Sequence, residues 1–489
     1  MDNAPSQPAL KRGVGGGDKV TSVTPSLVPA SVLLAAARPD WLIQWGHFAT
    51  ETTPSNLPQA LLKQAKLILL DCIGAMAAGM QETETSALAA RLAGRNKSGH
   101  VAAIGAGIKL CAADAAFANG IAGTTLELDE GNQYARGHPG IHVLPAALAA
   151  CCLTQSSGAA LLRAFSLGYE VGARIGIASR LRSSVHPHGS WGTVGAALAV
   201  ALLNNGNASQ CAEIISLSAS LSVAPSLRTM FEGATVRNSY CGFSNRNGLE
   251  AWDLVASGFT GERDGVKSVY SSILGEEFRP EDMLKDLGTR WEMQRNYFKR
   301  HAACRFVHGA LDVVMQLNAS SELQDLSRIR RIEVETYSLA AQLDATEPQN
   351  MLAAKFSLPF AIATTLIHGK ASVPAFRVNA VMDERIRKLA QRVEVLENPG
   401  FSALLPDQRP ARLTIEFDDG SVMTGETFNN RGDFTSPYHS DEVIEKYFEL
   451  TVPIWGQAHA EKIHAEIDGL EQQESLGSLN DLLAAPPGH

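Results

Sequence analysis

Helical periodicity over the first 290 residues, with little strand-like alternation, is the feature that most limits how this chain can fold. Pro58 is followed by QALLKQAKLILLDCIGAMAAG, whose apolar residues on one helical face are Leu61, Leu62, Ala65, Leu69 and Ile73. Further helical segments are predicted at 85–94, 111–123, 143–155, 158–180, 190–204, 209–222 and 246–257. The first part of the chain is therefore expected to be a helical domain.

The pattern changes after Lys299. RIRRIEVETY alternates as a strand does, KLAQRVEVLE holds a second short candidate, and ARLTIEFDDGSVMTGET predicts a hairpin turning at residues 418–421. LAAKFSLPFAIATTLIHGK, between these strands, is helical, and helical patterns return from Ser440. The expected fold is mainly α, with a large all-helical domain built from both chain ends and an inserted, smaller α+β lid domain.

These patterns give four segments. We expect a disordered N-terminal tail at 1–40, the first part of the helical domain at 41–295, the lid at 296–432 and the C-terminal part of the helical domain at 433–489. A body with an inserted lid places a cleft between the two, and small-molecule sites are common in such clefts.

Composition narrows the functional classes. The 489 residues exceed one ordinary core, and a net charge of -9 argues against nucleic acid as a partner while leaving room for a local cationic pocket. Seven cysteines without a C-x-x-C pair indicate reduced thiols, and they argue against an iron–sulfur cluster or a structural zinc site. No apolar run has membrane-spanning length, so we expect a soluble cytoplasmic protein. A mitochondrial transit peptide in the tail is the less favoured alternative, because Asp2 and Asp18 are untypical of one.

A polar segment between two apolar helices, LELDEGNQYARGHPGIHVLP from Leu126, concentrates ionisable side chains. These are Glu127, Asp129, Glu130, Arg136, His138 and His142, with glycines and Pro139 breaking the periodicity. A loop that carries acids, a base and a cation suits general acid/base catalysis. The alternative is a solvated polar connection. We refer to this segment as the acid loop.

A second cluster reads VHPHGSWGTVGAALAVALL. His186 and His188 precede Gly189 and an Ala-rich helix, so backbone amides and a histidine could meet an anion there. The alternative is a loop histidine that caps a helix. Metal binding is disfavoured, because the two histidines are two residues apart across a proline with no third ligand nearby.

Two further clusters are rich in cations. TVRNSYCGFSNRNGLEAW reads as a polar turn before a helix and carries Arg237, and YFKRHAACRFVHGALDVV carries Lys299, Arg300 and His308 at the predicted domain boundary. The second could instead be a basic solvated face. Together they predict a cationic wall opposite the acid loop, which suits a di- or tricarboxylate whose α-proton is removed.

In their order, these motifs resemble the MmgE/PrpD family, which includes 2-methylcitrate dehydratases, cis-aconitate decarboxylases and an iminodisuccinate epimerase. The resemblance runs from about residue 41 to residue 483 and rests on LLDCIGAMAAG, ANGIAGTTLELDEGN with HPGIHVLPA, HPHGSWGTVGAALA, VRNSYCGFSNRNGLEA, KRHAACRFVHGALD and AAKFSLPFAIA. It implies a homodimer, an active site between the domains, and no metal or organic cofactor.

Matched motif by motif, the resemblance assigns site residues. The catalytic set is Glu127, Asp129, His138 and His186, and the substrate-binding set is Arg237, Lys299, Arg300, Cys304 and His308. The chain departs from the family pattern where Glu127 and Glu130 replace aspartates, Arg237 replaces lysine and Tyr240 replaces histidine. Arg237 keeps the charge but cannot act as a base, so we expect it to hold a carboxylate.

The leading hypothesis is a cofactor-independent lyase that dehydrates 2-methylcitrate or a related alkylcitrate by general acid/base chemistry. One of Glu127, Asp129 and His138 would remove the α-proton, and His186 or His138 would protonate the leaving hydroxyl. The alternatives are a cis-aconitate-type decarboxylase, an epimerase at an acidic α-carbon, and an inactive dimeric scaffold that keeps only the fold.

Overall fold

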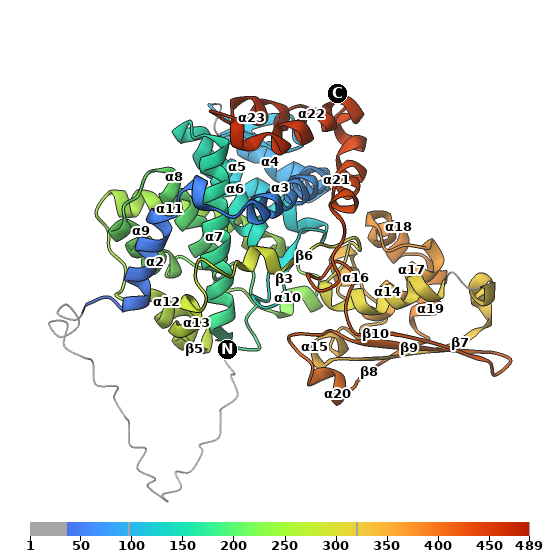
Figure 1. Ribbon diagram of the computed structural model, residues 1–489. Coiled ribbons are helices and arrows are strands. Elements are labelled where there is room, and N and C mark those ends of the chain that lie inside the picture. Colours follow the sequence, from blue (N-terminus) through green and yellow to red (C-terminus); the bar gives the residue numbers. More distant parts are fainter. Residues whose placement is uncertain (1–36, 96–97, 319–320, 489) are drawn as a thin grey trace, which may run out of the picture. The chain divides into compact units, whose positions relative to one another are not determined.

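Helices make up most of the described chain, as the periodicity predicts. The structure is a computed structural model that describes residues 37–95, 98–318 and 321–488, so residues 1–36 of the predicted tail lie outside it. The helices of the first part are α2 (Asp40–Glu51), α3 (Gln59–Met80), α4 (Thr83–Arg95), α5 (Ala112–Thr125), α6 (Pro139–Thr154), α7 (Gly158–Ala178), α8 (Gly192–Leu203), α9 (Ala208–Ala219), α10 (Arg228–Phe231), α11 (Val236–Ala256), α12 (Gly265–Lys267) and α13 (Pro280–Leu284). The mainly α fold is confirmed (Figure 1).

The rest of the chain mixes short helices with strands before returning to helices. The helices are α14 (His308–Leu317), α15 (Ser338–Ala341), α16 (Met351–Lys355), α17 (Leu358–His368), α18 (Val378–Val381), α19 (Glu384–Ala390), α20 (Pro399–Ser402), α21 (Ser440–Trp455), α22 (Gln457–Asp468) and α23 (Gly477–Leu483). The strands of the whole chain are β1 (Val101–Ala103), β2 (Ile108–Leu110), β3 (Gly131–Asn132), β4 (Ser179–Leu181), β5 (Gly275–Phe278), β6 (Asn296–Tyr297), β7 (Ile329–Thr336), β8 (Val393–Glu397), β9 (Ala411–Phe417) and β10 (Val422–Thr427).

One predicted boundary was wrong. Helix α11 begins at Val236, ten residues before the predicted start, so the supposed polar turn that carries Arg237 is helical. Gly242 and Asn245 of this segment serve helix packing. A Cβ on Gly242 would lie 2.6 Å from the Phe117 carbonyl oxygen of α5, and the Asn245 side chain donates to the Ile141 carbonyl of α6 at 3.0 Å.

The strands predicted after residue 300 form one four-stranded sheet in the order β10-β9-β7-β8. Strands β9 and β10 are the predicted hairpin, in which Thr414 pairs with Thr424 and Gly420 adopts a φ of +84° at the turn. Strand β7 pairs antiparallel with β9 and parallel with β8. Helices α14 and α17 pack on this sheet, α14 against β9 and β10 and α17 against β8 (Figure 1).

Two main hydrophobic clusters fill the interior. The larger one combines side chains from residues 41–298 with others from 443–483, and α21 packs along α3, so both ends of the described chain share one core. The second lies mainly among residues 302–417, and Leu126 and Leu128 of the acid loop join it. The acid loop therefore contributes to the boundary between the two clusters. The predicted domain limits stay predictions.

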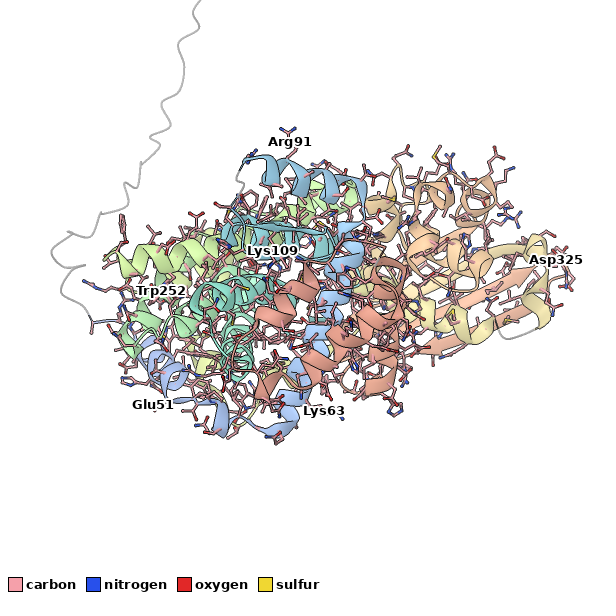
Figure 2. All side chains as sticks on the ribbon, turned by 90° about the horizontal axis from the view of Figure 1, so that it is seen from above. Glu51, Lys63, Arg91, Lys109, Trp252 and Asp325 are labelled. Carbon is pink, nitrogen blue, oxygen red and sulfur yellow. The ribbon has the colours of Figure 1, made fainter. Side chains whose placement is uncertain are left out.

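Charged side chains project from the surface, among them Lys63, Arg91 and Asp325 in Figure 2. No helix in the part of the chain that the structure describes is long and apolar enough to cross a membrane.

Candidate active site

The acid loop begins where α5 ends. Leu126 is the C-cap residue of α5, and Glu127 follows it in the left-handed conformation, with φ of 56°. That position after a helix is usually filled by glycine, because a side chain there is strained by about 1 to 3 kcal/mol. Glu127 keeps its side chain in this conformation, and the side chain is buried.

Asp129 and His138 form the centre of the loop. Oδ2 of Asp129 lies 2.9 Å from Nδ1 of His138, and both side chains are buried. His138 is the N-cap residue of α6, yet its ring makes no capping hydrogen bond and turns to Asp129 instead; Pro139 begins the helix, as its fixed φ favours. A carboxylate at Nδ1 orients the ring and leaves Nε2 as the nitrogen that can exchange a proton with a substrate.

Two cations meet these carboxylates. Arg237, from the first turn of α11, forms a buried ion pair with Glu127. Nζ of Lys299 lies 3.6 Å from Oε2 of Glu127 and 3.8 Å from Oδ1 of Asp129. The short ladder β3–β6, in which Gly131 pairs with Tyr297, holds the acid loop beside the segment that carries Lys299.

The charges in this group set its ionisation. Burial alone would raise the pKa of Glu127, but the nearby charges of Arg237 and Lys299 outweigh it, and the pKa is lowered. Burial opposes ionisation of Asp129 in the same way, and His138 and Lys299 reverse the effect, so its pKa is also lowered. Both carboxylates are thus ionised at neutral pH.

His186, which was predicted to be catalytic, contacts His188. Its Nδ1 accepts a hydrogen bond from the backbone N–H of His188 at 3.1 Å, and its ring centroid is 4.8 Å from that of His188. His188 comes closer, with its ring centroid 4.6 Å from that of His138 and its Nε2 3.4 Å from Nη2 of Arg237. The second of the two histidines is therefore the better placed to act on the charged group.

A third histidine extends the chain of rings. Nε2 of His142 lies 3.2 Å from Nδ1 of His188, and Nδ1 of His142 lies 3.0 Å from the Ser244 hydroxyl. Gly192 permits this approach, because a Cβ there would lie 2.5 Å from the His142 ring. Burial is the main reason that the pKa of His142 is lowered to about 3 and that of His188 is well below its usual value. The two rings are therefore uncharged at neutral pH. His142 contacts His188, which in turn contacts Arg237, so the rings help to fix the position of Arg237.

Two predicted binding residues are not brought to this group. Arg300 donates to Glu445 and Glu449 of α21 at 2.8 and 3.1 Å, so its guanidinium is paired with that helix. His308 is buried, but its ring nitrogens contact Nη1 of Arg305 at 3.0 Å and the Ala303 carbonyl at 3.2 Å.

Cys304 is buried beside the charged group. Its backbone N–H donates to the Lys355 carbonyl at 2.9 Å. Burial, with a smaller contribution from Glu127, raises the pKa of its thiol to about 11. The thiol is therefore protonated at neutral pH and is suited to contact rather than to nucleophilic attack.

Lys355, in α16, is a site residue that the sequence analysis missed. Its Nζ donates to the Thr125 carbonyl at 2.9 Å, next to the Thr124 carbonyl that Arg237 approaches at 3.5 Å. Burial lowers its pKa to about 8. A lone lysine inside the apolar run LAAKFSLPF was the available signal, since lysine is rarely buried without a partner. With Arg237 and Lys299, it makes three cations around two carboxylates.

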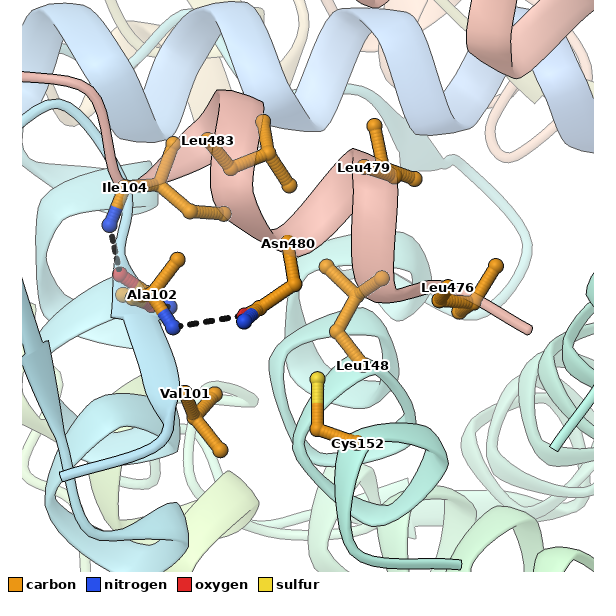
Figure 3. A pocket seen from close by; sticks show the side chains of 10 residues that line it. Val101, Ala102, Ile104, Leu148, Cys152, Leu476, Leu479, Asn480 and Leu483 are labelled. Atoms are coloured by element: carbon orange, nitrogen blue, oxygen red, sulfur yellow. Dashed lines mark hydrogen bonds between the residues drawn. The ribbon is translucent and has the colours of Figure 1, made fainter. Parts of the chain in front are cut away.

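No group of three or more His, Cys, Asp or Glu side chains is arranged to hold a metal ion within residues 37–95, 98–318 and 321–488. A small cavity of about 10 Å³ lies elsewhere, where Asn480 of α23 accepts a hydrogen bond from the Ala102 N–H at 2.9 Å (Figure 3). It is large enough for about one water molecule, and none of the charged residues above line it.

The fold and site define a mainly α protein in which an Asp–His pair and three cations meet at the boundary of two hydrophobic clusters. The MmgE/PrpD N-terminal domain matches residues 44–270 and the MmgE/PrpD C-terminal domain matches residues 301–472. The chain belongs to the MmgE/PrpD family, as the motifs indicate.

Two relatives show how far the similarity extends. A cis-aconitate decarboxylase from Aspergillus terreus is 24% identical over 471 residues, covering 90% of this chain and 95% of the relative. A cis-aconitate decarboxylase from Mus musculus is 23% identical over 388 residues, covering 76% of this chain and 78% of the relative.

Proposed function

We propose that this protein is a lyase for citrate-like di- or tricarboxylates, that it needs no metal or organic cofactor, and that it decarboxylates cis-aconitate or a closely related unsaturated acid. The sequence favoured dehydration of 2-methylcitrate. The relatives are named for decarboxylation and cover 90% and 76% of this chain, which supports that alternative over dehydration.

The observation that carries the proposal is the state of Lys299. Its ammonium group is fully buried and has no hydrogen-bond partner among the described residues, although it lies within 4 Å of Glu127 and Asp129. Nε of Arg237 is likewise buried without a partner in that part of the chain. Unused donors on buried cations are costly unless a ligand completes them, and a carboxylate is the ligand that they fit.

In the proposed reaction, ionised Glu127 keeps Arg237 and Lys299 in place through its contacts with both cations. Arg237, Lys299 and Lys355 hold carboxylates that the substrate keeps. The remaining carboxylate leaves as CO₂, and the electron pair of the broken C–C bond moves through the neighbouring double bond toward a carbon beside a retained carboxylate. The cations stabilise this negative charge, and His138, oriented by Asp129, delivers the proton that forms the new C–H bond.

The inactive-scaffold alternative is disfavoured by the same geometry. The acids, His138 and the cations converge, and Tyr240 and Trp191 pack against the neighbouring histidines. The Tyr240 ring is 6.3 Å from that of His186, and the Trp191 ring is 5.9 Å from that of His142. The homodimer and the cytoplasmic location expected from the sequence stay predictions.

A substrate survey tests the proposal. Purified protein is incubated separately with cis-aconitate, citrate and 2-methylcitrate, and products are followed by proton NMR. Loss of CO₂ from cis-aconitate supports the proposal. Loss of water from 2-methylcitrate alone would replace decarboxylation by dehydration, and turnover of none of the three would reject this substrate class.

A further inference from the structure

A buried ion pair outside the group of proposed catalytic and binding side chains joins two distant parts of the chain. Nζ of Lys446, on α21, lies 2.5 Å from Oδ1 of Asp71, on α3, and the two residues are 375 positions apart. Lys446 is 3% exposed and Asp71 is 1% exposed. Taking two such charges out of water is costly, so a pair of this kind calls for a reason beyond helix packing.

Both partners also bind the backbone of the acid loop. Lys446 donates to the Leu128 carbonyl oxygen at 2.5 Å, and Oδ2 of Asp71 accepts from the Glu130 N–H at 2.9 Å. These two groups belong to the peptide bonds on either side of the Asp129 Cα. The ion pair thus binds the backbone immediately before and immediately after Asp129, the residue that orients His138.

A neighbouring contact fixes the other half of the Asp129–His138 pair. Oε1 of Glu130 accepts from the Gly140 N–H at 2.7 Å, two residues after His138, and Oε2 accepts from the Tyr169 hydroxyl at 3.1 Å. The acid loop is therefore tied to α3 and α21 at Asp129 and to the first turn of α6 beside His138. Side chains are held in productive geometry when such surrounding contacts lock their backbone.

A purely structural role for the pair would need only the contact between α3 and α21. Apolar side chains of similar size usually make such a contact at equal or lower cost. The two bonds to the peptide groups flanking Asp129 are what an apolar pair could not supply. They assign the ion pair to the loop as well as to the helices.

We propose that Asp71 and Lys446 are positioning residues that hold Asp129 in register with His138 for proton transfer. This inference rests on the proposed function for its kinetic consequence. The C-terminal helix α21 is, on this account, a working part of the active site even though it offers no side chain to the substrate.

Two variants, Asp71→Asn and Lys446→Met, are compared with Tyr447→Phe. Tyr447 is the buried neighbour of Lys446 on α21, and its hydroxyl donates to the Ala460 carbonyl at 3.0 Å, away from the acid loop. We expect kcat for cis-aconitate to fall about 10- to 100-fold in both ion-pair variants with KM nearly unchanged, because misplacement of a catalytic group slows the chemical step. Tyr447→Phe should lower the melting temperature and leave kcat alone.

Hydrogen–deuterium exchange read by mass spectrometry gives a second result that needs no activity. Peptides that cover residues 127–131 should exchange faster in both ion-pair variants and at the wild-type rate in Tyr447→Phe. Normal exchange in the ion-pair variants, or an equal loss of kcat in Tyr447→Phe, would overturn the proposal. If a single variant fails to fold, the double variant Asp71→Asn/Lys446→Gln removes both charges together and carries the same test. If the wild-type protein turns over no tricarboxylate, the proposed function fails while the exchange result still decides the positioning role.

Discussion

Nδ1 of His138 lies 2.9 Å from Oδ2 of Asp129, and neither side chain is more than 9% exposed. The two residues lie near opposite ends of a loop, and Pro139, the first residue of α6, follows His138 directly. This buried pair provides a proton carrier with a fixed orientation, placed among cations that suit a polycarboxylate.

Asp129→Asn should lower kcat for cis-aconitate by about 10²- to 10⁴-fold, because the amide no longer orients His138 as the carboxylate does. KM should change little, since substrate carboxylates are held by other residues. Steady-state kinetics measures both. A variant that raises KM and keeps kcat would show that Asp129 binds substrate instead.

Arg237→Met should move the acid limb of the pH profile of kcat/KM to higher pH. Removing the guanidinium raises the pKa of Glu127, so the carboxylate is lost at a higher pH as the pH falls. The pH profile of kcat/KM measures the shift. Arg237→Lys keeps the charge and should move the limb less, and an unmoved limb in Arg237→Met would contradict the assignment.

Lys355 should make substrate capture sensitive to alkaline pH. Its pKa of about 8 means that it loses its charge as the pH rises through that value, so kcat/KM for a tricarboxylate should fall there. Lys355→Met should have lower kcat/KM at pH 7 and lack this fall. Lys388→Met, which replaces an exposed lysine, is the control and should behave as wild type. The same alkaline fall in Lys355→Met would exclude Lys355 as its source.

Glu130 should make stability depend on pH in a direction unusual for a carboxylate. Burial raises its pKa to about 8, so between its usual value and that one the folded protein holds a proton that the unfolded chain releases. Stability contributed by this group is fully present below the usual pKa of a glutamate and is lost as the pH rises through about 8. Urea unfolding at pH 5 and pH 8 measures how much the free energy of unfolding decreases between the two pH values. This decrease should be smaller for Glu130→Gln than for wild type. Exposed Glu84→Gln is the control, and an unaltered decrease in Glu130→Gln would contradict the account.

Removal of divalent metal should leave activity intact, because Arg237, Lys299 and Lys355 supply the positive charge that the substrate needs. Dialysis against EDTA followed by assay checks this. Activity lost on dialysis and restored by one added metal would show that a metal ion takes part.

The sequence predicted the helical body, the β9–β10 hairpin and the residues of the acid loop, because local periodicity and a run of ionisable residues carry those signals. It could not predict that His188 contacts His138 and Arg237 while His186 contacts His188, or that Arg300 pairs with α21. Those outcomes depend on how chain segments meet. His188 contacts Arg237, 49 positions away, and Arg300 donates hydrogen bonds to two glutamates of α21, which lie more than 140 positions away.

Asp71 and Lys446 show the same limit more sharply. A single acid in LLDCIGAMAAG and a single lysine in DEVIEKYFELT look like ordinary helix residues. Their role arises only when α21 packs along α3 and the two charges close on the Leu128 and Glu130 peptide groups.

The most direct test of the central claim uses cis-aconitate labelled with ¹³C at its carboxyl groups, in D₂O, with wild-type protein and His138→Asn. We expect wild type to release one equivalent of labelled CO₂ for each product molecule that gains one carbon-bound deuterium, and the variant to do neither at a comparable rate. Equal release by the two proteins, or loss of water without labelled CO₂, would contradict the decarboxylation through His138 and Asp129 proposed for this site.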